Sequence, residues 1–141
     1  MNKKTIILLA ASLCVLSACT TESIEEEIVL VEGVDLACSI EANTSANDMS
    51  LKIKIINLGT ETIEGEDLFR YTASINGDEV FTQREDSITL ESGAEFNSTY
   101  PVPRKIYKYE DSGVVSCAVD VDSEFEEANE SNNSSETNYT F

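Results

Sequence analysis

Five carboxylates crowd a short stretch near the end of the chain, and they are the side chains best suited to chemistry. Acidic residues at alternate positions offer the oxygen ligands that Ca²⁺ takes in loop sites. Phe125 stands where such a loop needs glycine, however, and a glutamate comes too early in the stretch. We therefore favour a structural turn over a metal site and keep calcium as the alternative cofactor. The candidate calcium ligands are Asp120, Asp122, Glu124, Glu126 and Glu127.

Most other catalytic groupings are missing from the sequence. It contains no histidine, which removes Ser–His, Cys–His and His–metal sites together. Its six glycines are isolated, so there is no phosphate-binding loop. The 27 acidic residues could supply a carboxylate pair for glycoside hydrolysis, but that chemistry usually needs a deeper cleft than one small domain offers. We predict no catalytic residues, with a small hydrolase as a remote alternative.

Cys19 closes a segment at the start of the chain that is typical of exported proteins. Lys3 and Lys4 precede an apolar run that ends in small residues, as in a secretory signal. Residues 16–19 read Leu-Ser-Ala-Cys, which resembles the bacterial lipobox, where diacylglycerol is attached to the cysteine and the chain is cut just before it. We expect residues 1–18 to be a lipoprotein signal peptide and Cys19 to carry the lipid that attaches the chain to a membrane.

Two other interpretations of this segment are an ordinary signal peptide with an incidental cysteine and a short membrane span. The apolar run is shorter than the ~20 residues that a span needs. Thr20 is not the aspartate that holds many Gram-negative lipoproteins in the inner membrane, so the resemblance favours the outer membrane of a bacterial envelope. Residues 19–32 are rich in Glu, Ser and Thr, and we expect an acidic tether there. Its apolar patch, 28–31, could begin the first strand or form a small strand of its own.

The charge of the mature chain limits its partners. Removal of residues 1–18 takes two lysines away, so seven basic and 27 acidic residues remain and the net charge is −20. Such a charge repels nucleic acid and anionic headgroups, which excludes nucleic acid as a partner. A protein or glycan partner remains open. The one cluster of basic and aromatic residues, 104–109, is a candidate contact patch, although an exposed loop is the simpler interpretation.

The rest of the chain alternates apolar and polar residues, as half-buried strands do. About seven short strands and no convincing helix follow from this pattern, which indicates an all-β, immunoglobulin-like antiparallel β-sandwich. Asn76-Gly77 predicts a tight hairpin turn, and Pro101 and Pro103 keep their strand from a central position. The candidate strands are 34–41, 51–55, 69–75, 79–82, 96–102, 115–121 and 136–141, with a further short one at 87–90.

Cys38 and Cys117 both fall in the inward phase of their predicted strands. Cys14 leaves with the signal and Cys19 carries lipid, so these two thiols remain in an oxidising compartment. We predict a disulfide between them inside the core, where it would close a loop of about 80 residues and remove roughly 4 kcal/mol of denatured-state freedom. Two free buried thiols are the alternative.

Residues 127–133, in the last third of the chain, read Glu-Ala-Asn-Glu-Ser-Asn-Asn. This run resembles the closing motif of the CARDB family, the cell-adhesion-related domain found in bacteria. Residues 34–36 resemble its opening, and 55–60 resemble the turn after its second strand. The resemblance covers about 34–141 and implies a seven-stranded immunoglobulin-like sandwich without catalytic residues. The motif residues are Glu127, Asn129, Glu130, Asn132 and Asn133.

The closing motif also has a purely structural interpretation. Asn and Asp cap backbone groups and tolerate left-handed conformations, so they suit a wide turn between two strands. We predict that residues 33–141 form one non-catalytic binding or structural module on a lipid-anchored envelope protein. The alternative is a calcium-dependent adhesion module that uses the acidic loop 120–130.

Overall fold

The computed structural model describes residues 28–46, 48–64, 69–104 and 110–141. Within these ranges the chain forms seven strands and one short 3₁₀ helix, and the predicted all-β class is confirmed. The strands are β1 (Leu36–Thr44), β2 (Asp48–Asn57), β3 (Phe69–Ile75), β4 (Asp78–Glu85), β5 (Glu95–Pro103), β6 (Ser112–Val119) and β7 (Ser134–Thr140). The helix, η1, spans Glu130–Asn132.

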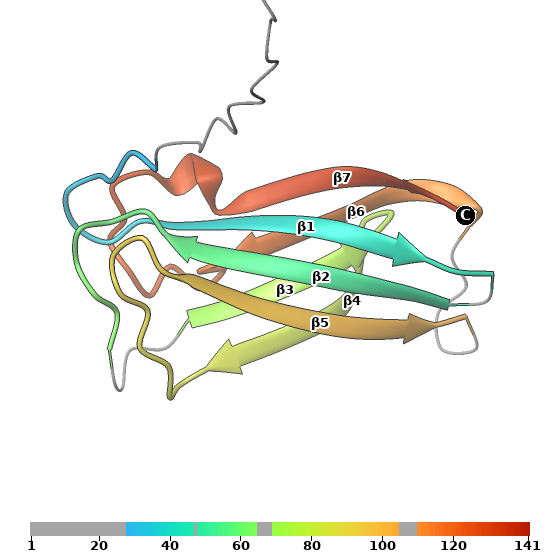
Figure 1. The fold of residues 1–141 in the computed structure, drawn as a ribbon, viewed down its shortest axis with the longest axis horizontal. Coiled ribbons are helices and arrows are strands. Elements are labelled where there is room, and N and C mark those ends of the chain that lie inside the picture. The colour runs from blue at the N-terminus through green and yellow to red at the C-terminus, as the bar shows by residue number, and fades with distance from the viewer. Residues whose placement is uncertain (1–27, 47, 65–68, 105–109) are drawn as a thin grey trace, which may run out of the picture.

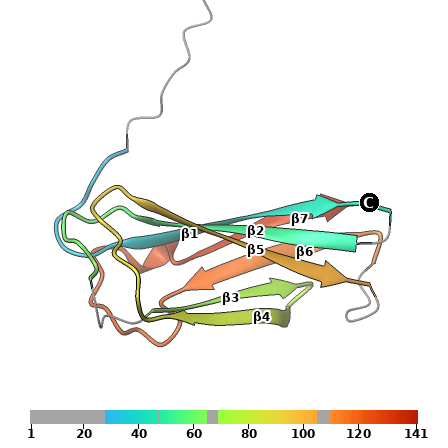
Figure 2. The same cartoon turned by 60° about the horizontal axis from the view of Figure 1, so that its bottom comes forward.

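The strands form two antiparallel sheets that pack as the predicted sandwich. One sheet has the order β1-β2-β5 and the other has the order β4-β3-β6-β7. Figure 1 looks onto the three-stranded sheet, and in Figure 2 β3, β4 and β6 of the second sheet lie below it as a separate layer. Strand β1 lies beside β7 of the other sheet in both views. The start of β1 and the chain between β6 and β7 therefore meet at one end of the sandwich.

Strand β2 illustrates how the alternating pattern makes the core. Met49, Leu51, Ile53 and Ile55 are each at most 1% exposed, whereas the lysines between them face outward. Successive strand residues point to opposite faces, so every second side chain enters the space between the sheets. At about 25 cal/mol per Å² of apolar surface, burial of such side chains is the main favourable term for the fold.

The hairpin between β3 and β4 turns at Asn76-Gly77, as predicted. Both residues have positive φ, 52° and 89°, as the favoured two-residue hairpin turns require. The Asn76 side chain also accepts a hydrogen bond from Val114 N at 2.9 Å and donates one to the Tyr139 hydroxyl at 3.4 Å. The turn is thereby attached to β6 and β7.

Two sequence expectations differ from the structure, and a third agrees with it. Residues 87–90 are not a strand: Leu90 makes one isolated bridge, to Ile63, because it is a buried loop residue that fills the core. The patch 28–31 is not a strand either: Val31 forms an isolated bridge to Gly59, and residues 28–30 have no regular structure. The strand that contains the two prolines, β5, lies at a sheet edge, where missing N–H donors are tolerated.

The predicted signal peptide, the lipidation site Cys19 and the first part of the tether lie outside the described residues. The same is true of residues 105–109 in the basic aromatic cluster. Among the residues that are described, no helix has the length and the apolar character needed to cross a membrane.

Candidate functional site

The candidate residues gather in the chain segment 120–133, which joins β6 to β7 and is called the closing loop below. It lies at the end of the sandwich where β1 begins, and η1 is part of it (Figure 1). The loop pairs with the entry to β1 through a bridge between Val34 and Glu127 and a hydrogen bond from Ala128 N to Val34 O of 3.0 Å. Residues that are 90 or more positions apart in sequence therefore meet there.

Asp120 shapes the first turn of the closing loop. It is 3% exposed and has a φ of 49°, a left-handed conformation that Asp tolerates better than most residues. Its carboxylate accepts hydrogen bonds from Glu124 N at 2.8 Å and Phe125 N at 3.3 Å. The first predicted calcium ligand thus satisfies backbone donors of its own loop.

Asp122 and Glu124 form ion pairs with arginines of the neighbouring strands. Arg70 of β3 donates to both carboxylate oxygens of Asp122. Arg84 of β4 lies 2.7 Å from Glu124 Oε1 and 3.7 Å from Asp122 Oδ2. These pairs connect the closing loop to the four-stranded sheet and neutralise two of the five candidate ligands. Glu126 is exposed, as Asp122 and Glu124 are.

Glu127 connects the closing loop to β1. Its carboxylate accepts hydrogen bonds from Leu36 N and, at 3.0 Å, from Asn133 Nδ2. Burial, together with the nearby carboxyl of Asp120, raises the pKa of Glu127 to about 7, although the two hydrogen bonds act in the opposite direction. Burial and a hydrogen bond with Asp120 also raise the pKa of Glu124, whereas Arg84 opposes that shift.

The asparagines of the closing motif are engaged within the fold. Asn129 caps η1 by accepting from Ser131 N at 3.1 Å. Asn132 donates to Asp35 at 3.0 Å, and Asn133 donates to both Glu127 and Glu130. The motif therefore organises the turn into β7 and attaches it to the start of β1.

Two buried polar residues that sequence reasoning did not select complete this end of the domain. Asp35 is 2% exposed and accepts from Leu58 N through its backbone oxygen and from Asn132 through its side chain. Asn57 is fully buried, donates to Glu61 O at 2.7 Å and Leu90 O at 3.0 Å, and accepts from Gly59 N. Both residues lie in segments that resemble the family, 34–36 and 55–60. This resemblance is the sequence signal that could have pointed to them.

Over the described ranges, no group of three or more Asp, Glu or Cys side chains is arranged so that it could hold a metal ion. The physical reason lies in the contacts above. Arginines take up Asp122 and Glu124, and backbone amides take up Asp120 and Glu127.

Cys38 of β1 and Cys117 of β6 are both buried, and both are free thiols, so the predicted disulfide is not formed in this structure. The two thiols nevertheless lie close enough to affect each other's pKa. A hydrogen bond to Cys117, together with burial, raises the pKa of Cys38, and the same bond lowers the pKa of Cys117. Cys38 also donates to Asn133 O at 3.4 Å, which brings the thiols into contact with the closing motif.

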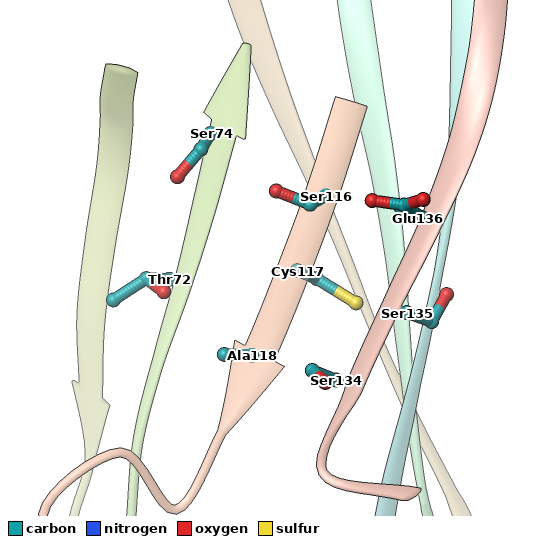
Figure 3. Close-up of a pocket in the computed structure, with 8 residues that line it drawn as sticks. All are labelled: Thr72, Ser74, Ser116, Cys117, Ala118, Ser134, Ser135 and Glu136. Atoms are coloured by element: carbon teal, nitrogen blue, oxygen red, sulfur yellow. The ribbon is translucent and has the colours of Figure 1, made fainter. Parts of the chain in front are cut away.

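A shallow hollow on the outer face of the four-stranded sheet is the other surface feature near these residues. Hydroxyl side chains from β3, β6 and β7 dominate its lining, and Figure 3 shows the Cys117 sulfur directed toward Ser135. Its lining offers hydrogen bonds and one carboxylate, Glu136, but no pair of acid and base. The lining residues are Thr72, Ser74, Ser116, Cys117, Ala118, Ser134, Ser135 and Glu136.

Residues 33–137 match the family model of the CARDB domain, and this range contains the whole closing motif. The chain belongs to the CARDB family. The predicted resemblance is thus confirmed. In this CARDB domain the motif residues have defined structural contacts, whereas Cys38 and Cys117 are additions to the pattern on which the resemblance was based.

Solved structures show the same fold at low sequence identity. The chain is similar to the crystal structure of a Pyrococcus furiosus CARDB domain in complex with di-metal ions, with a TM-score of 0.61 and 19% identity over 76% of this chain and 92% of that one. A solution structure of the same domain gives a TM-score of 0.61 and 18% identity, over 78% of this chain and 96% of that one.

A third similar structure is a domain of a Methanosarcina acetivorans protein that is described as a cell surface protein. Its TM-score is 0.56, with 22% identity over 76% of this chain and 90% of that one. At these identities the likeness shows a shared fold. No curated protein matches the sequence.

Proposed function

We propose that this protein is a lipid-anchored component of a bacterial envelope whose CARDB domain acts as a non-catalytic binding or structural module. The observation that carries the proposal is the family match over residues 33–137. CARDB domains are associated with cell surfaces, and one similar domain belongs to a protein described as a cell surface protein.

The contacts of the closing loop support a non-catalytic role. A general acid and base would need free access to a substrate, but four of the five candidate carboxylates, all except Glu126, accept from backbone amides or pair with arginines. The sequence also lacks histidine altogether. Binding or structural support of the envelope is the function that this arrangement favours.

The anchor in this proposal is Cys19, acylated after removal of residues 1–18. Leu-Ser-Ala-Cys at 16–19 supports the lipid, and Thr20 favours delivery to the outer membrane. The acidic residues of 19–32 then hold the domain away from the lipid surface.

A binding experiment tests the module. The full-length protein, purified from the envelope in detergent, is offered envelope proteins and neutral glycans at physiological salt. Saturable capture of one component supports the proposal. Two controls are needed: the heat-unfolded protein, and an unrelated protein of similar acidity, because a charge near −20 attracts basic proteins without specificity. Turnover of an offered glycan would contradict the non-catalytic assignment.

A calcium-dependent adhesion module is the second candidate. The observation in its favour is that a similar CARDB domain was crystallised in complex with di-metal ions. Mutual repulsion between Asp120 and Glu127 is the local feature that a cation would relieve.

A further inference from the structure

We propose that Cys38 and Cys117 are an oxidisable dithiol that closes into a disulfide between the two sheets, clamping them together beneath the closing motif. The proposal rests on the proposed function in one respect: the envelope is an oxidising compartment that supplies the oxidant. The bond itself is a property of the folded domain, and it can be tested on purified protein.

The two thiols are placed for this bond by the sandwich. Cys38 lies on β1 of one sheet and Cys117 on β6 of the other, and both point into the core, at 6% and 3% exposure. Both belong to the core between the sheets, where β1 packs against β6, and each thiol shifts the pKa of the other. Since Cys14 and Cys19 belong to the predicted signal and lipid site, each of the two thiols has the other as its natural partner.

The surroundings of the pair tolerate loss of the S–H donors. Cys38 donates to Asn133 O, but the same oxygen also accepts from Val119 N at 2.8 Å. Oxidation therefore leaves no buried acceptor without a partner, and the turn into β7 keeps its main-chain bond. An unsatisfied buried group would otherwise oppose the bond.

The reaction is a thiol–disulfide exchange. Cys117 is the member whose pKa is lowered, and because both thiols are buried it meets an oxidant when the strands around it open locally. Its thiolate attacks a disulfide oxidant and expels one thiolate. The Cys38 sulfur then attacks the mixed disulfide, which forms the bond between the sheets and releases the second thiol. The two cysteines lose two protons and two electrons, and the oxidant is reduced to two thiols.

The bond would connect positions about 80 residues apart and would restrict the unfolded chain strongly. We expect the thermal midpoint of the oxidised protein to exceed that of the reduced protein by roughly 10–25 °C. The contact between Cys38 and Asn133 O implies that the clamp also holds the closing motif.

The experiment equilibrates the purified, full-length protein with oxidised or reduced glutathione, then blocks free thiols under denaturing conditions. We expect the oxidised sample to lose the mass of two hydrogen atoms, to contain one linked peptide pair with Cys38 and Cys117, and to melt at the higher temperature. Complete alkylation of both thiols after oxidation, or equal midpoints in the two samples, would overturn the proposal.

The double variant Cys38→Ala/Cys117→Ala is the matched control, and its midpoint should not depend on the redox buffer. The peptide map of the unmodified protein needs no variant, so the proposal stays falsifiable if the double variant does not fold. Failure of lipidation or of envelope binding would contradict the proposed function and leave this result unchanged, because the oxidation is carried out in vitro.

Discussion

At the scale of single residues, the carboxylates of the closing loop divide into two kinds. Asp122 and Glu124 carry ion pairs at the surface, which typically contribute little to stability. Asp120 and Glu127 accept from backbone amides in a less exposed setting. Their removal would leave donors without partners, so the two kinds are expected to respond differently to substitution.

Glu127→Ala is expected to lower the free energy of unfolding by about 1–3 kcal/mol, because Leu36 N and Asn133 Nδ2 both lose an acceptor. The neighbouring Glu126 is exposed, and Glu126→Ala should stay within about 0.5 kcal/mol of the parent. Urea denaturation of both variants measures the difference. Equal effects would show that the contacts of Glu127 do not matter for stability.

The raised pKa of Glu127 predicts a pH dependence. Its folded value is about 7, above the ordinary 4.5, so the protonated carboxyl is favoured by the fold. The stability that this shift contributes is complete below about pH 4.5 and is lost as the pH rises through 7. Glu127→Gln should therefore show a flatter decline in denaturation midpoint between these pH values than the parent protein. Parallel profiles would contradict the assignment, because the remaining charges are common to both.

Calcium should stabilise this protein no more than sodium chloride of matched ionic strength. Screening alone relieves repulsion in a chain of net charge near −20, and ion pairs already occupy Asp122 and Glu124. Thermal midpoints with calcium, magnesium and matched salt test this expectation. A shift specific to calcium that is lost in Asp120→Asn/Asp122→Asn would promote the adhesion module over the passive one.

At the scale of elements, the domain depends on the contact between the β2–β3 turn and the segment that leads into β1. Val31 N donates to Leu58 O at 2.9 Å, and Leu58 N donates to Asp35 O at 2.7 Å. Gly59 is needed where these segments cross, because a Cβ there would lie 2.1 Å from Gly33 O. Two backbones approach each other too closely for any side chain.

Gly59→Ala should accordingly cost about 3 kcal/mol or more, since backbone atoms must move to admit the methyl group. Gly33→Ala is the matched variant. Gly33 has a φ of 94° with open space around its Cβ position, so alanine there meets conformational strain alone, about 1–2 kcal/mol. Chemical denaturation compares the two. A smaller loss for Gly59→Ala than for Gly33→Ala would contradict the steric argument.

At the scale of the whole molecule, an acidic sandwich follows a segment with the features of a lipoprotein signal. The exposed apolar side chains Ile28, Val29 and Leu30 lie at the first described positions, between the predicted anchor and the domain. The proposed anchor would keep the domain close to the membrane although its charge repels anionic headgroups.

Cys19→Ser should abolish partitioning into the detergent phase and block cleavage before residue 19, because the serine offers no thiol for the lipid. Phase separation and intact mass of the envelope fraction measure both effects. Cys14→Ser is the control, since that cysteine lies within the predicted signal and should not affect anchoring. Unchanged membrane retention of Cys19→Ser would contradict the lipid anchor.

The sequence alone determined the fold class, the hairpin at Asn76-Gly77 and the family, because these follow from local patterns. The alternation Leu51, Ile53, Ile55 needs only the geometry of one strand to place those residues in the core. The spacing of residues in the closing motif likewise identifies the family, although the sequence does not show which contacts these residues make. The false strand at 87–90 has the same origin, since a loop residue that fills the core looks apolar in the same way.

Only the tertiary structure decided which partners the carboxylates bind and that the two buried cysteines are free thiols. Glu127 meets Leu36, and Asn132 meets Asp35, across more than 90 positions of sequence. Arg70 and Arg84 reach the acidic loop because β3 and β4 share a sheet with β6. Such partners are set by how strands pair and sheets stack, and no local pattern encodes a contact between side chains that are neighbours only after the sandwich has closed.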